Sequence, residues 1–90
     1  MELKPIYENC KSYYKKAIIL DLGAYVILSS YNTEVCVINT AEHSFVVYGG
    51  NCYQNYLTTT TLRHIKEFLK QYFYNGNVEI TKKDLLKHLY

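Results

Sequence analysis

The residues with the chemistry for metal binding or catalysis are three cysteines and three histidines in a chain of 90 residues. A structural zinc site is normally recognised by ligand pairs about two to four residues apart. No two cysteines have that spacing, and the set best able to meet would combine Cys10, His43 and Cys52. We therefore predict no metal site, no cofactor and reduced, unpaired thiols, since an odd number of cysteines also argues against a disulfide framework.

Nucleophilic catalysis would need a cysteine or serine beside a histidine that acts as its base. The closest such pair in the sequence is His43 with Ser44, which falls in a predicted turn. Gly49 and Gly50 are more typical of a turn than of a phosphate-binding loop. A chain this short also uses most of its apolar residues for one core. The sequence therefore favours a protein that is not an enzyme.

Tyrosines and lysines are interleaved in the segment SYYKKA, and a second lysine cluster lies near the C-terminus. Tyrosine rings stack on bases and lysines neutralise phosphates, so these residues are candidates for nucleic-acid binding. The formal net charge of +2 is too small to indicate this function by itself. A solvated helix face whose tyrosines dock on the sheet explains the same residues. The candidates are Lys11, Tyr13, Tyr14, Lys15, Lys16, Lys82 and Lys83.

The composition is unusual in its eleven tyrosines, beside three phenylalanines and no tryptophan. So many phenol rings cannot all be buried, and those on the surface give it the composition of a contact face. Part of the excess is also consistent with the codon usage of an AT-rich genome. The predicted protein-binding residues are Tyr25, Tyr48, Asn51, Tyr53, Gln54, Asn55 and Tyr56.

Four β-branched and aromatic runs lie between Ala17 and Tyr48, with short connections between them. Short connections predict a meander of three to four antiparallel strands. Alternation places Ile18, Leu20, Leu22, Val26, Leu28, Val35, Val37, Phe45 and Val47 on one face. The other face, with Ile19, Tyr25, Ile27, Cys36, Ile38, Val46 and Tyr48, is nearly as apolar. Such a sheet is either sandwiched between helices or meets a partner, and a second copy of the chain is one candidate.

The clearest helical pattern runs from Thr60 to Tyr74 and predicts one long amphipathic helix packed against the sheet. Threonines at 58–61 are its N-cap candidates, Glu67 falls on its polar side, and Asn75 with Gly76 provides a left-handed stop.

Short helices are predicted at both ends of the chain. Apolar residues recur at helical spacing between Lys4 and Lys16, after Pro5. Thr81 and Asp84 have the spacing of a capping box, which opens a helix to about Leu89. The whole chain, residues 1–90, is thus expected to form a single α+β domain.

Two segments, SSYNTEVCVI and TTTTLRHIKEFL, resemble the signature of a family of small uncharacterised domains found in phage genomes. The signature reads S-Y-x-T-x-V-x-x-I, then T-T-x-R-H-I-x-x-F-L at the opening of a helix. The residues of this signature are consistent with a structural role. Thr60 or Thr61 would cap the helix, and Arg63 and His64 would reach backbone carbonyls or the turn at Tyr31. We expect Tyr31, Thr60, Thr61, Arg63 and His64 to hold the fold.

The small size, the absence of a catalytic constellation, the surplus of surface tyrosines and this resemblance together lead us to expect a phage or prophage protein that binds and inhibits a host protein. A CRISPR effector nuclease is the most plausible single target. A nucleic-acid-binding accessory or regulatory protein is the alternative. The N-terminus lacks the pattern of a secretory signal, and no apolar run is long enough to span a membrane. We therefore expect a protein of the cytoplasm, that of the host cell for a phage protein, with no membrane partner.

Overall fold

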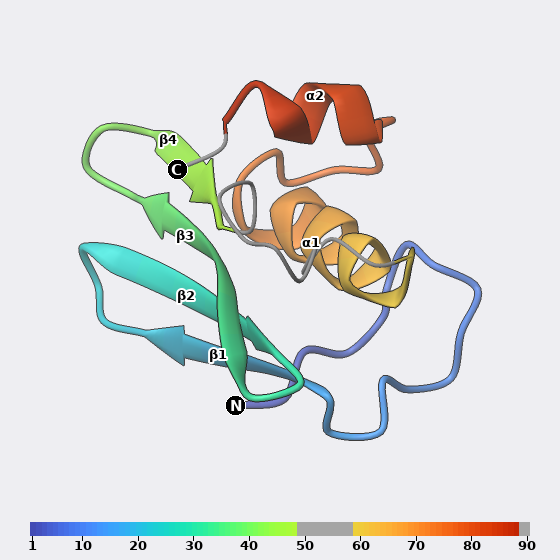
Figure 1. The fold of residues 1–90 in the computed structure, drawn as a ribbon. Helices are drawn as coiled ribbons and strands as arrows, with labels where there is room; N and C mark the ends of the chain where they lie inside the picture. The colour runs from blue at the N-terminus through green and yellow to red at the C-terminus, as the bar shows by residue number, and fades with distance from the viewer. Residues whose placement is uncertain (49–58, 89–90) are drawn as a thin grey trace.

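The computed structural model describes residues 1–48 and 59–88. These residues form an α+β fold with one four-stranded antiparallel sheet in the order β1-β2-β3-β4, which confirms the predicted meander (Figure 1). The elements are β1 (Ala17–Asp21), β2 (Tyr25–Ser30), β3 (Thr33–Asn39), β4 (Ser44–Val47), α1 (Thr59–Tyr72) and α2 (Lys82–Leu86).

The strands are joined by tight turns with residues in the left-handed region. Gly23, between β1 and β2, has a φ of 84°, which glycine adopts without steric cost. Only Tyr31 and Asn32 separate β2 from β3, with φ values of 53° and 65°. Positive φ at both central residues is the pattern of a type I′ hairpin turn, whose twist matches that of the strands.

One face of the sheet is buried against the helices and forms the core. Cross-strand partners such as Ile19 with Leu28 and Leu28 with Cys36 have their side chains on this face. The buried apolar residues of the four strands are Ala17, Ile19, Val26, Leu28, Val35, Cys36, Ile38, Phe45 and Val47.

The predicted assignment of faces is correct for β2 and β4 and wrong for β1 and most of β3. Ile19 and Cys36 face the core, whereas Ile18 faces outward. The two faces are so similarly apolar that alternation by itself does not choose between them. The register also shifts between Leu28 and Ser29, and such a bulge breaks the simple alternation in β3.

Both helices are short, so the predicted long amphipathic helix is not found. Helix α1 has 14 residues and packs on β2 and β3 through Ile65, Phe68 and Leu69, which are fully buried. The left-handed residue after it is Asn75, with a φ of 54°. Because α1 begins at Thr59, Thr60 and Thr61 lie in its first turn and are not N-caps as predicted.

Helix α2 has 5 residues and begins as predicted. The Thr81 side chain accepts a hydrogen bond from the Asp84 amide, and Asp84 accepts one from the Thr81 amide. The hydrogen bond that the Thr81 amide donates to the Asp84 carboxylate is the main reason why the pKa of Asp84 is lowered. Leu85 anchors the helix in the core, and the His88 carbonyl accepts a hydrogen bond from the amide of Val47 in β4.

The N-terminal arm, residues 1–16, contains no helix, so the predicted helix from Lys4 to Lys16 is wrong. Its first residues pair with the edge of β1 through a bridge between Glu2 and Ile18. The arm then continues along α1 without regular secondary structure (Figure 1). Its backbone groups must therefore find partners outside a helix.

Candidate functional site

A buried carboxylate holds the N-terminal arm on α1. Glu67 is only 2% exposed, although the helical pattern placed it on the polar side. Its two oxygens accept hydrogen bonds from the consecutive amides of Ile6, Tyr7 and Glu8, at 3.0 to 3.2 Å. The side-chain amide of Gln71 donates hydrogen bonds to the Glu67 carboxylate at 2.6 Å and to the backbone carbonyl of Lys4 at 2.7 Å. In a helix these amides would donate to backbone carbonyls four residues earlier. Here the Glu67 carboxylate accepts their hydrogen bonds instead.

A second carboxylate, Glu8, links the arm to the opening of α1. It accepts hydrogen bonds from the Tyr13 hydroxyl and from Nε of Arg63. Partial burial would by itself raise the pKa of Glu8, but these two hydrogen bonds and the charge of Arg63 outweigh it, and the pKa is lowered. Burial, followed by the hydrogen bond to Glu8 and the negative charge of Glu8, raises the pKa of Tyr13. Both groups therefore keep their usual charge states at neutral pH.

A buried polar network joins β2 to α1 behind this link. Ser30 Oγ lies 2.8 Å from Nδ1 of His64 and 3.4 Å from Oγ1 of Thr61. The edge of the Tyr13 ring packs on the His64 ring, with 4.5 Å between their centroids. Ser30 is 2% exposed and His64 is 1% exposed, so a substrate has no access to the serine hydroxyl. We interpret the pair as a structural hydrogen bond and not as a catalytic dyad.

Burial of His64 predicts how the stability of the protein depends on pH. Desolvation is the main reason why its pKa lies below the ordinary value of 6.5, with Glu8 raising it and Arg63 lowering it further. As the pH falls through 6.5, the unfolded chain binds a proton at this position that the folded chain does not, so the free energy of unfolding decreases. Below 4.5, the lowered pKa of Glu8 adds a second loss of stability.

We expect the melting temperature to decrease as the pH is lowered from 6.5 towards 4.5. His64→Gln, which retains a hydrogen-bonding side chain, should flatten the curve in this interval and leave the loss at lower pH. Circular dichroism melts of both proteins across a pH series measure the effect. An unchanged slope in the variant would show that His64 is not the titrating group.

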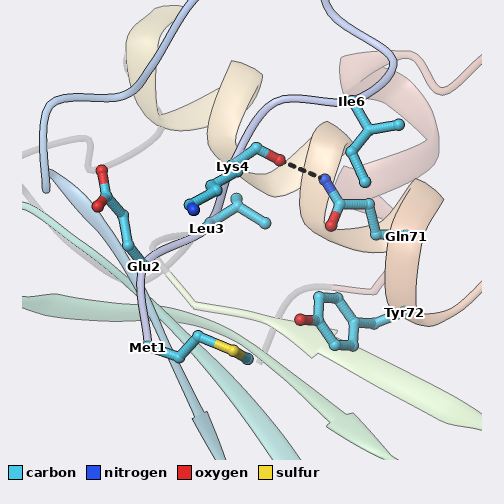
Figure 2. A pocket seen from close by; sticks show the side chains of 7 residues that line it. All are labelled: Met1, Glu2, Leu3, Lys4, Ile6, Gln71 and Tyr72. Atoms are coloured by element: carbon cyan, nitrogen blue, oxygen red, sulfur yellow. Dashed lines mark hydrogen bonds between the residues drawn. The ribbon is translucent and has the colours of Figure 1, made fainter.

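The arm also forms one side of a pocket. The pocket has a volume of about 510 Å³ and lies between the first residues of the chain and the end of α1 (Figure 2). The hydrogen bond from Gln71 to the Lys4 carbonyl crosses one side of it. Its lining has no histidine, cysteine or serine, and its residues are Met1, Glu2, Leu3, Lys4, Ile6, Gln71 and Tyr72. The lining therefore lacks the pair of a histidine with a serine or cysteine that nucleophilic catalysis commonly uses.

The predicted protein-binding residues fall partly outside the described residues. Tyr25 starts β2 and is 47% exposed, and Tyr48 follows β4 and is half-buried. The other five, Asn51, Tyr53, Gln54, Asn55 and Tyr56, lie in the range 49–58, outside the part of the chain that the structure describes.

The candidate nucleic-acid residues have different environments. Tyr13 is 5% exposed, so its ring is not available to a base, contrary to the sequence-based hypothesis. Tyr14 is 73% exposed, and Lys11, Lys15 and Lys16 are exposed with it on the arm. Lys82 and Lys83 lie in α2 and do not belong to that group.

The cysteines that the structure describes are free thiols. Cys36 is fully buried in the core, which raises its pKa, and Cys10 is half-buried and donates to the Ser12 carbonyl at 3.2 Å. His43 stacks on Phe73, with 4.3 Å between ring centroids. In residues 1–48 and 59–88 no three histidine, cysteine or acidic side chains are placed to hold a metal ion. Cys52, the third member of the best predicted set, lies outside these ranges.

The second feature of functional interest is the outer sheet face, defined here as Ile18, Leu20, Tyr25, Ile27, Val37 and Val46. Leu20 pairs with Ile27, Ile27 with Val37, and Val37 with Val46, so one apolar row crosses all four strands. Leu20 is 54% exposed and Ile18 is 36% exposed. Figure 1 shows α1 and α2 on the opposite side of the sheet. The sequence predicted two apolar faces but not which residues would remain outside.

Comparisons with known proteins identify a family but no function. No helix among the described residues has the length and apolar character needed to cross a membrane. No curated protein and no solved structure matches the chain. Residues 1–87 match a family described as a family of unknown function (DUF8033). The match includes the arm, the sheet and both helices, and the chain therefore belongs to this family.

Proposed function

We propose that the protein is a non-enzymatic binding protein whose outer sheet face docks on another protein. The observation that supports this most directly is the apolar row across the four strands, which the helices leave uncovered. Contiguous exposed apolar surface on a small domain is typical of interaction sites. Tyr25, at the end of this face, has the amphipathic ring that is enriched in protein interfaces.

The charge distribution supports a partner with a basic surface. The sequence has no lysine or arginine from Ala17 to Leu62, a range that includes the whole sheet. Its acidic residues in that range are Asp21, Glu34 and Glu42, which lie near the ends of the strands and are exposed. An apolar centre with an acidic rim is complementary to an apolar patch with a basic rim.

The resemblance of SSYNTEVCVI and TTTTLRHIKEFL to a signature of phage domains favours a host protein as that partner, and we propose inhibition of a host defence nuclease. Nucleases of the CRISPR type hold nucleic acid in positively charged channels. A basic channel wall is the kind of surface that an acidic rim would recognise. A CRISPR effector nuclease is therefore the first target to test.

The test measures cleavage by a purified, guide-loaded CRISPR effector nuclease, and its co-elution with the protein in size-exclusion chromatography. We expect the parent chain to co-elute and to reduce cleavage. Leu20→Lys with Tyr25→Lys should weaken binding about tenfold or more, because a charge then enters the apolar contact (about 1.4 kcal/mol per factor of ten). The control is Leu86→Lys, the same change at a leucine of α2 that is 44% exposed.

Both variants should melt close to the parent, since substitutions of exposed residues usually change stability little. Equal binding by the sheet variant and the control would contradict the proposed docking face. Absence of both co-elution and inhibition would exclude this nuclease as the target.

Light scattering over a range of concentrations tests whether the outer sheet face instead binds a second copy of the chain. A dimer that Leu20→Lys dissociates would assign the face to self-association.

A further inference from the structure

Two neighbouring turns each place a tyrosine in the left-handed region. In the turn of residues 13–16, Tyr14 and Lys15 have φ values of 54° and 64°, and the Lys16 amide donates to the Tyr13 carbonyl at 2.9 Å. The hairpin turn of residues 30–33 repeats this pattern at Tyr31 and Asn32. Type I′ turns normally have asparagine, aspartate or glycine at their central positions. A bulky side chain with positive φ is uncommon and is often associated with function.

The two turns lie side by side, although 17 positions separate their tyrosines. Ala17, directly after the first turn, pairs with Ser30, and the Tyr31 amide donates to the Lys16 carbonyl at 2.8 Å. Both tyrosines line one pocket of about 160 Å³. Tyr14 is 73% exposed and Tyr31 is 48% exposed. Burial in the core therefore does not explain why either position carries an aromatic ring.

Two cations line the same pocket. The Lys16 ammonium lies 5.2 Å from the centre of the Tyr31 ring. Arg63, in α1, also lines the pocket, and its side chain is 46% exposed. The adjacent carboxylates already have partners within the protein. Glu8 accepts hydrogen bonds from Arg63 and Tyr13, and Glu2 accepts one from the Lys15 amide. The side chains of Lys15 and Lys16 are exposed and extend the positive charge along the arm.

We infer that this pocket, the tyrosine-turn pocket, binds single-stranded nucleic acid by stacking a base on Tyr14 and Tyr31. Exposed aromatic rings beside lysines and an arginine are the elements from which such sites are built. Lys15 and Lys16 would neutralise the phosphates on either side of the stacked base, since the charge of Arg63 is already balanced by Glu8. Single strands are favoured because the bases of a duplex are stacked on one another and do not offer their faces. The inference does not depend on the proposed protein-binding function.

The experiment measures fluorescence anisotropy of a labelled, mixed-sequence single strand of about 12 nucleotides at low salt, with the matching duplex as a second probe. We expect the single strand to bind more tightly than the duplex. Tyr14→Asn and Tyr31→Asn should each weaken binding about tenfold, which is within the usual range for one stacking contact. Tyr14→Phe and Tyr31→Phe should retain binding. The matched control is Tyr25→Asn, which removes an exposed tyrosine at the other end of β2.

Thermal melts provide a readout that a merely structural role would not give. Asparagine tolerates positive φ better than tyrosine, so Tyr14→Asn should melt at or above the parent temperature while it loses affinity. Affinity that follows melting temperature, or that is the same in all variants, would overturn the inference. So would absence of binding at micromolar protein, or equal competition by heparin, which carries anionic charge without bases. The Leu20→Lys and Tyr25→Lys changes on the outer sheet face should leave this binding unchanged, which separates the two proposals.

Discussion

Glu67→Ala is expected to lower the free energy of unfolding by about 3 kcal/mol and to detach the N-terminal arm from α1. The substitution removes the acceptor of three consecutive backbone amides and of the Gln71 amide. Hydrogen bonds to a charged group contribute about 1.5–3 kcal/mol each, and buried donors without a partner add a further cost. For a domain of this size, the melting temperature should fall by on the order of 15 °C.

Limited trypsin digestion measures detachment of the arm separately from global unfolding. Lys11, Lys15 and Lys16 are exposed sites within the arm. In Glu67→Ala they should be cleaved first, at a temperature where far-ultraviolet circular dichroism still reports a folded sheet. The variant Glu67→Gln keeps the shape and one acceptor oxygen, so it should be intermediate. Glu79→Ala, at an exposed glutamate, is the matched control. A melting temperature of Glu67→Ala equal to that of Glu79→Ala would contradict the proposed role.

His64→Ala is expected to cost about 3 kcal/mol, the second largest effect. It removes a fully buried ring, leaves Ser30 without its closest partner and opens a cavity beside Tyr13. Large-to-small core substitutions cost about 2–5 kcal/mol, depending on how far the surroundings collapse. Chemical denaturation at neutral pH measures the loss. His64→Gln, which can still reach Ser30, should be less destabilised.

This prediction also tests whether the signature residues hold the fold or serve a function. In a structural role, partner binding by His64→Ala should decrease only in proportion to the unfolded fraction. Arg63→Ala, at an exposed side chain, should change stability much less, because a partly exposed ion pair contributes about 0–1 kcal/mol. Loss of binding by His64→Ala at an unchanged stability would instead assign His64 to a functional site.

The sequence by itself determined the elements whose signals are local. The order and pairing of the strands follow from apolar runs with short connections, which permit hairpins but no parallel crossover. Thr81 and Asp84 form their capping box because each partner is only three residues away. Ile65, Phe68 and Leu69 face the sheet because their spacing matches one turn of a helix.

Tertiary structure decided the features that depend on distant partners. The arm has helical spacing of apolar residues, yet Glu67 binds the amides of residues 6–8 from about 60 positions away, so no helix forms there. The same contact buries a residue that helical periodicity assigned to solvent. The inner face of the sheet was undetermined because both faces are apolar, and the tertiary core includes Ile19 at 3% exposure but leaves Ile18 36% exposed. Tyr14 and Tyr31 meet at one pocket only because Ala17 pairs with Ser30. Periodicity reports which neighbours along the chain share a face, whereas these contacts arise from the pairing of distant segments.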